Sequence, residues 1–157
     1  MSATATVISF RKTSEPYGWL GNMSAYPVRH GGRCYRTAEA LFQVLRFEDE
    51  SIRNEIWLQK SPMSAKHKAK KHKSLMTITP KSERDIENMR MVVRLKAEQN
   101  ADIKRFLLAT GDATLVEDTT ARSDQFWGAA LINGTWVGEN ILGRIWMELR
   151  EEYRANR

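Results

Sequence analysis

Two carboxylates, Glu39 and Asp124, have neighbours that suit them to chemistry. Glu39 lies in the stretch Tyr35-Arg36-Thr37-Ala38-Glu39-Ala40-Leu41-Phe42-Gln43, where Thr37 can cap a helix whose first turn holds the acid. A carboxylate on a rigid helix can act as a catalytic group. Asp124 comes three residues before Trp127-Gly128, in a segment predicted to be a loop. Binding and catalytic residues are common on loops, so this acid is a second candidate.

Each candidate also has a purely structural interpretation. An acid in a first turn interacts favourably with the helix dipole, so Glu39 taken alone is better explained as a capping charge. Asp124 suits a turn cap, with Trp127 buried in the core. Asn140 is placed as the N-cap of a final helix, and Asn22 as a turn residue. These interpretations stay open until the rest of the chain is considered.

Composition excludes several other chemistries. One cysteine and three histidines do not make a zinc ligand set, and we expect neither a metal nor another cofactor. Phosphate-loop, dinucleotide-binding and serine-nucleophile motifs are also absent from the sequence. The single cysteine, Cys34, permits no intrachain disulfide and suggests a reducing compartment; it lies in a predicted strand, where we expect it to be buried. Carboxylate chemistry is therefore the main option.

The positive charge of the chain is concentrated in one segment. The net charge is +6, and Lys60–Lys73 contains six lysines and no acid; the other basic and acidic residues balance at 19 each. This segment can attract anions, although a solvated helix face is the simpler interpretation. No apolar run approaches the roughly 18 residues of a membrane span. We expect a cytoplasmic protein with no membrane partner.

The elements that must position these groups predict an α+β fold, mostly helical with a small antiparallel sheet. We expect a single domain over residues 1–157, with its core at about 6–153. Gly31-Gly32 and Asn133-Gly134 are turn signals for two hairpins. Further strands are predicted at 6–10 and 114–117. Helices are predicted from Ala38 to about Glu48-Asp49-Glu50, around 52–57, from Pro62 through the lysine run, from Ser82 to about Ala97, over 101–110, and after Asn140. Ser82 and Asp85 have the spacing of a capping box at the start of their helix. The expected core positions of the last helix are Leu142, Ile145, Trp146 and Leu149.

Six segments in order resemble the NADAR family of YbiA-like N-glycosidases, and the resemblance covers Tyr17 to Arg150. The matching segments are Tyr17-Gly18-Trp19-Leu20-Gly21-Asn22; Tyr35 to Gln43; Ser61-Pro62-Met63 with Ala65-Lys66; Leu108-Ala109-Thr110-Gly111 with Leu115-Val116-Glu117; Asp124-x-x-Trp127-Gly128; and Gly138-x-Asn140-x-Leu142-Gly143, closing on Met147-Glu148-Leu149-Arg150. Any one of these segments alone is weak, but six in the right order make a strong match.

The resemblance implies hydrolysis of the C1′–N bond of a ribosyl group. Its substrate classes are phosphoribosyl intermediates of riboflavin synthesis and ADP-ribose attached to guanine, so the partner would be a nucleotide-like molecule carrying a ribose phosphate or ADP-ribose. By this resemblance Glu39 and Asp124 become candidate catalytic acids. The candidate substrate contacts are Trp19, Gly21, Asn22, Tyr35, Lys66, Trp127, Gly128 and Asn140. The basic segment Lys66–Lys73 could hold ADP-ribosylated nucleic acid.

The sequence departs from the family pattern at four places. Ala40 stands where the family has histidine, Ala69-Lys70 replaces its Gly-Arg, and no tryptophan occurs near Lys81-Ser82. The Asn133-Gly134 hairpin replaces a glycine-rich span. The missing histidine and tryptophan keep one alternative open, a module that binds ADP-ribose without cleaving it. The lysine run keeps open another, a surface that binds nucleic acid, although it has few interleaved aromatic residues for base readout.

Overall fold

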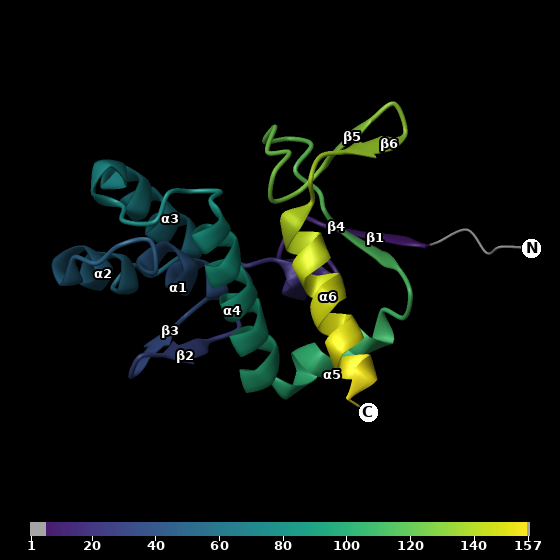
Figure 1. The fold of residues 1–157 in the computed structure, drawn as a ribbon, viewed down its shortest axis with the longest axis horizontal. Coiled ribbons are helices and arrows are strands. Elements are labelled where there is room, and N and C mark those ends of the chain that lie inside the picture. Colours follow the sequence, from purple (N-terminus) through teal and green to yellow (C-terminus); the bar gives the residue numbers. More distant parts are fainter. Residues whose placement is uncertain (1–5, 157) are drawn as a thin grey trace, which may run out of the picture. The chain divides into compact units, whose positions relative to one another are not determined.

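The computed structural model describes residues 6–156 and confirms the mostly helical α+β architecture (Figure 1). Its elements fall into two units, residues 22–101 and residues 6–21 with 102–156. Each unit is described separately below.

In residues 22–101, three helices pack around α1. Helix α1 contacts α2, α3 and α4, and α4 also contacts strand β2. The helix α1 and its neighbours α2 and α3 are drawn together in blue to teal in Figure 1. The elements are β2 (Val28–His30), β3 (Arg33–Tyr35), α1 (Ala38–Val44), α2 (Glu50–Trp57), α3 (Pro62–Lys71), the short 3₁₀ turn η2 (Lys73–Leu75) and α4 (Glu83–Gln99).

The first hairpin confirms the Gly31-Gly32 prediction. Strands β2 and β3 pair antiparallel, and both glycines have positive φ, as the favoured two-residue turn requires. Side chains alternate along β3, so that Tyr35 is buried and Cys34 is exposed. The expectation that Cys34 is buried was therefore wrong, because its strand position faces solvent.

Helix α1 ends earlier than predicted, at Val44 instead of near Glu48-Asp49-Glu50. Asp49, in the expected end of that helix, is instead the N-cap of α2: its Oδ1 accepts the N–H groups of Ser51 and Ile52. An N-cap residue has extended backbone geometry, so one helix cannot run through it. The apolar and acidic pattern did not reveal this break.

The start of α4 also differs in detail from the prediction. Ser82 caps the helix as expected, because its hydroxyl accepts the Asp85 N–H. The carboxylate of Asp85 does not complete a capping box. It accepts the backbone N–H of Lys81 at 2.8 Å and pairs with Arg46.

In residues 6–21 and 102–156, helix α6 packs against a two-stranded parallel sheet. Strand β1 pairs with β4 from Val7↔Thr114 to Phe10↔Glu117, and α6 packs on β4. The two hairpins are antiparallel as predicted, whereas this pair is parallel. The elements are β1 (Val7–Phe10), the 3₁₀ turn η1 (Gly18–Leu20), α5 (Ala101–Ala109, whose first residue belongs to the other unit), β4 (Thr114–Glu117), β5 (Ala130–Ile132), β6 (Thr135–Val137) and α6 (Ile141–Ala155).

The core of this unit follows the predicted apolar stripe of the last helix. The predicted inward positions Leu142, Ile145, Trp146 and Leu149 are all buried. The Trp146 indole donates to the Leu20 carbonyl oxygen at 2.9 Å, which ties α6 to η1. None of the helices in residues 6–156 is long and apolar enough to cross a membrane.

Candidate active site

Glu39 is a buried carboxylate with one fixed oxygen. Thr37 caps α1, since its hydroxyl accepts the Ala40 N–H at 3.2 Å, so the helix end does not depend on Glu39. The Glu39 side chain is 7% exposed, and its Oε1 accepts the Gln43 Nε2–H at 2.8 Å. Within residues 22–101, Oε2 has no hydrogen-bond partner. This arrangement is unusual for a simple capping charge, which is normally solvated.

Asn22 is bonded to the same helix turn through its backbone. Its carbonyl oxygen accepts the Glu39 N–H at 3.0 Å, and its Nδ2 lies 3.1 Å from the Met89 sulfur, a weak acceptor. The buried Oδ1 of Asn22 has no hydrogen-bond partner in the described structure. A buried acceptor left without a donor costs about 1–3 kcal/mol, so such a group requires an explanation. A donor on a bound substrate would satisfy it.

Tyr35 and Lys66 are placed on two other elements of this unit. Tyr35 ends β3 and is 6% exposed; burial raises the pKa of its phenol, although Arg33 and Arg53 oppose the rise. The phenol is therefore a neutral hydrogen-bonding group at physiological pH. Lys66 is half-buried on α3 and makes no ion pair within residues 22–101.

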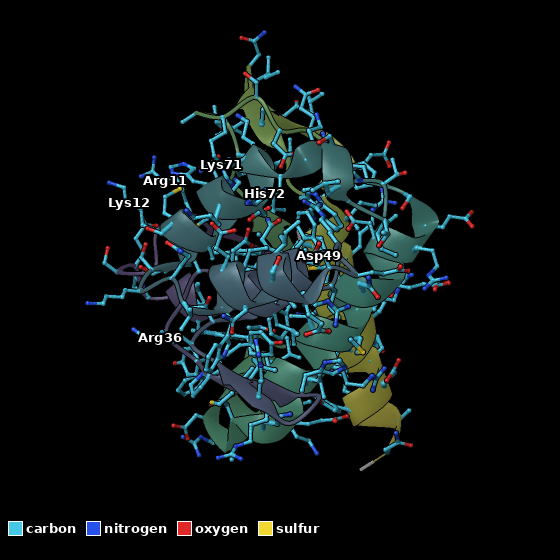
Figure 2. All side chains as sticks on the ribbon, turned by 90° about the vertical axis from the view of Figure 1, so that its left-hand side faces the viewer. Arg11, Lys12, Arg36, Asp49, Lys71 and His72 are labelled. Carbon is cyan, nitrogen blue, oxygen red and sulfur yellow. The ribbon has the colours of Figure 1, made fainter. Side chains whose placement is uncertain are left out.

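The basic segment is less uniformly positive than its sequence implies. Glu55 on α2 lies 3.5 Å from Lys68 and 2.9 Å from His72, and these two groups help to lower the pKa of Glu55 against the effect of desolvation. Figure 2 shows Lys71 at the end of α3 with His72 just after it, and Arg36 directed outward. Glu55 therefore neutralises part of the charge, which the sequence count for Lys60–Lys73 did not include.

Asp124 forms the turn that precedes Trp127. Its Oδ1 accepts the N–H groups of Phe126 at 3.0 Å and Trp127 at 3.2 Å, and its carbonyl oxygen accepts the Thr119 hydroxyl. The side chain is half-buried. The turn-cap interpretation is thus confirmed for one carboxylate oxygen. The catalytic assignment of Asp124 stays a prediction.

Trp127 is not buried in the core, contrary to the structural interpretation of this motif. It is half-exposed and meets Phe126 edge to face, with ring centroids 5.0 Å apart. Gly128 is buried, and a Cβ there would overlap the Glu117 carbonyl oxygen and the Thr119 side chain. Close packing therefore explains this glycine, and part of the Trp127 side chain is accessible to solvent.

Asn140 has a different structural role from the expected N-cap. It stands at the N-cap position with φ +51° but makes no capping bond. Its Nδ2 donates to the Leu115 carbonyl oxygen at 2.8 Å, and its Oδ1 accepts the Glu117 N–H at 3.0 Å. Both bonds join α6 to β4. The N-cap prediction was wrong because the left-handed backbone turns this side chain toward the strand.

We expect Asn140→Ala to lower the free energy of unfolding by about 2–3 kcal/mol, because two buried backbone groups of β4 lose their partners. Urea unfolding would measure the change. Asn133→Ala is the matched control, since Asn133 also has positive φ but is exposed in a hairpin turn. Equal losses in the two variants would mean that backbone strain alone accounts for the effect.

Trp19 and Gly21 lie in the segment that includes η1. The Trp19 ring contacts Phe106 and Trp146, with centroids 5.7 and 5.9 Å away, and it lines a cavity of about 740 Å³. The cavity also meets Ala113, just before β4 begins, whereas Asp124 and Asn140 lie in the segments after β4 ends. Among the candidate site residues, the cavity lining includes Trp19 alone. The substrate contacts proposed for Trp19 and Gly21 stay predictions.

Two buried charged residues that were not predicted from the sequence, Arg46 and Asp85, are linked to Glu39 through Gln43. Arg46, which follows the end of α1, donates to the Gln43 side chain at 3.3 Å and pairs with Asp85. Glu39, Gln43 and Arg46 are thereby linked to α4. The spacing of Glu39, Gln43 and Arg46 was a usable signal, because residues four and three apart share a helix face. Nothing local to Asp85 pointed to its role.

Known proteins resemble this chain over most of its length. The NADAR domain model matches residues 9–154. The chain is 37% identical over 147 residues to N-glycosidase YbiA of Escherichia coli strain K12, covering 94% of this chain and 88% of that protein. It is 31% identical to N-glycosidase Npun_R5314 of Nostoc punctiforme, covering 94% and 92% of the two chains. It is also 31% identical to the riboflavin biosynthesis protein VVA0006 of Vibrio vulnificus, but it spans 39% of that longer chain.

A solved structure shows the same fold. The NMR structure of the E. coli protein YbiA superimposes with a TM-score of 0.82 at 35% identity, covering 99% of this chain and 89% of that one. The family model matches most of the sequence, and the structural likeness covers nearly all of it. The chain therefore belongs to the NADAR domain family.

Proposed function

We propose that this protein is an N-glycosidase, a hydrolase that cleaves the C1′–N bond of an N-ribosyl substrate, with Glu39 as its principal catalytic carboxylate. The names of the N-glycosidase relatives support the reaction class. The observation that carries the assignment is the buried Glu39 side chain, which has one oxygen fixed by Gln43 and the other unpaired within its unit.

The chemistry explains why a held carboxylate suits this bond. As the C1′–N bond breaks, the base takes the electron pair, and positive charge builds on C1′ and the ring oxygen of the ribose. Glu39 stabilises this cation electrostatically and orients the water molecule that forms the new C1′–O bond. The leaving base gains a proton, and the water loses one. A carboxylate that is already desolvated and oriented needs little reorganisation for this task.

The remaining candidate residues take roles that match their chemistry. We propose that Asp124 binds ribose hydroxyls or protonates the leaving base, and that the half-exposed indole of Trp127 stacks on that base. The unpaired Oδ1 of Asn22 accepts a hydrogen bond from the substrate. Lys66 meets a phosphate, since it is a half-buried cation with no acidic partner within residues 22–101.

Two substrate classes follow, ADP-ribose attached to guanine and a phosphoribosyl intermediate of riboflavin synthesis. The Vibrio relative named for riboflavin biosynthesis supports the second class. The proposal is tested with a panel of both substrates, in which release of ADP-ribose and of ribose 5-phosphate is followed by chromatography. Release from neither class, with ADP-ribose bound intact, would favour the binding-module alternative that Ala40 keeps open.

The same assay also tests whether the basic segment holds a nucleic-acid substrate. If the lysines of α3 hold ADP-ribosylated DNA, activity on an oligonucleotide should fall steeply with salt, because each phosphate contact releases counterions. Activity on the free ADP-ribosylated nucleotide should change much less. Equal salt dependence for the two substrates would exclude a role for the basic segment in holding nucleic acid.

A further inference from the structure

Four buried polar side chains form a continuous hydrogen-bonded chain that ends on Glu39. Gln43 donates to Glu39 at 2.8 Å, Arg46 Nη1 donates to Gln43 Oε1 at 3.3 Å, and Arg46 Nε and Nη2 donate to the two Asp85 oxygens at 2.9 and 2.7 Å. The exposed fractions are 7% for Glu39, 4% for Gln43, 8% for Arg46 and 0% for Asp85. All four belong to residues 22–101.

The two ends of this chain leave the Gln43 amide only one orientation. A guanidinium has donors and no acceptor, so Arg46 must face the amide oxygen. An ionised carboxylate has acceptors and no donor, so Glu39 must face the amide NH₂ group. A flipped amide would set two donors against each other at Arg46 and two acceptors against each other at Glu39. Arg46 therefore determines which group Glu39 meets.

Arg46 is itself held on two sides. Asp85 binds two of its N–H groups in the bidentate geometry that guanidinium and carboxylate favour, and the Arg46 guanidinium lies 4.5 Å from the Phe42 ring centre. Asp85 is fixed in turn by the Lys81 N–H at the start of α4. The position of the guanidinium is thus set by groups on α1 and α4.

Stability alone gives a weak reason for this ion pair. Removing two charges from water is costly, and a well-packed apolar pair of similar volume is often as stable as a buried ion pair. Arg46 and Asp85 do something that an apolar pair cannot, because they direct the Gln43 N–H toward Glu39. The geometry is therefore better explained by a role in the site than by a role in the core.

We propose that Arg46 and Asp85 are positioning residues, which act through Gln43 to hold the Glu39 carboxylate in one orientation with Oε2 left for the substrate. This inference rests on the proposed role of Glu39 in glycoside hydrolysis. Neither charged residue needs to touch the substrate.

The test replaces the ion pair by apolar residues in the double variant Arg46→Met/Asp85→Leu. We expect the variant to fold, kcat to fall about tenfold and KM to stay within about twofold, because orientation is lost while substrate contacts remain. Gln43→Met should give a similar fall, and combining the three changes should add little, since all act on one carboxylate. Asp102→Leu/Arg105→Met, which removes an exposed ion pair, is the matched control and should leave kcat unchanged.

A readout other than turnover separates this inference from the proposed function. In the wild type, hydrogen exchange of the Gln43 side-chain NH₂ group, followed by NMR, should be slow, and the double variant should exchange faster. A folded double variant with normal kcat and slow exchange would overturn the inference, as would losses that add independently of Gln43→Met. If Glu39→Gln turns over normally, the proposed catalytic role of Glu39 fails, and the exchange rates alone then decide whether Arg46 and Asp85 orient the carboxylate.

Discussion

Replacing Glu39 by glutamine is expected to lower kcat for the N-ribosyl substrate by at least about a hundredfold while the fold persists, the scale of one acid–base or electrostatic group. Glutamine matches the volume of the buried side chain and can still accept from Gln43 through its amide oxygen. It carries no charge, so it cannot stabilise the developing ribosyl cation. The measurement is product release under saturating substrate, with the unfolding midpoint recorded beside it.

Glu48→Gln is the control for this experiment. Glu48 is an exposed acid between α1 and α2, so its loss removes the same charge from the same unit without touching the buried network. We expect normal turnover in this variant. Near-normal turnover by Glu39→Gln would contradict the assignment of Glu39 as the catalytic carboxylate.

Much of the local structure could be predicted because short-range chemistry decides it. Ser61-Pro62 starts α3, and the Ser61 hydroxyl accepts the Ser64 N–H as a cap should. The turns at Gly31-Gly32 and Asn133-Gly134 need positive φ, which glycine and asparagine tolerate. At these places the residue type that identifies the turn in the sequence is also the one that the backbone conformation requires.

The predictions that failed depend on partners distant in the sequence. Asn140 has the residue type of an N-cap, but its side-chain amide oxygen and nitrogen are both hydrogen-bonded to the backbone of β4. Asp85 has the spacing of a capping box, but Arg46 binds its carboxylate. In both cases the side chain makes two hydrogen bonds to groups that are distant in the sequence, whereas a local cap would give it one. Sequence spacing alone cannot rank these competing partners.

Lys96, in the hydrophobic core, is a further residue whose environment cannot be predicted from sequence spacing. It lies on α4 between the buried residues Val93 and Ala97 and is itself fully buried, a position where lysine is rarely found. Its ammonium nitrogen lies 2.8 Å from the Ser24 hydroxyl oxygen and 5.4 Å from the Tyr26 ring centre. Burial lowers the pKa of Lys96 from 10.5 to about 7, because an apolar environment disfavours the charged amine.

This lowered pKa predicts a pH-dependent contribution to stability. Below about pH 7 both the folded and unfolded chains are protonated at Lys96, and the full cost of burying the charge is present. Between about pH 7 and pH 10.5 the unfolded chain binds a proton that the folded chain does not, so the free energy of unfolding rises with pH. Across the window the rise amounts to roughly 5 kcal/mol at most.

Lys96→Met isolates this contribution, since methionine fills a similar volume and does not titrate. We expect the stability of the variant relative to the wild type to be greatest near about pH 7 and to decline steadily toward about pH 10. Urea unfolding at several pH values measures the difference, and Lys70→Met, at an exposed position on α3, should show no comparable trend. A constant difference between Lys96→Met and the wild type would mean that the buried amine keeps its proton throughout, and that groups around it compensate for its charge.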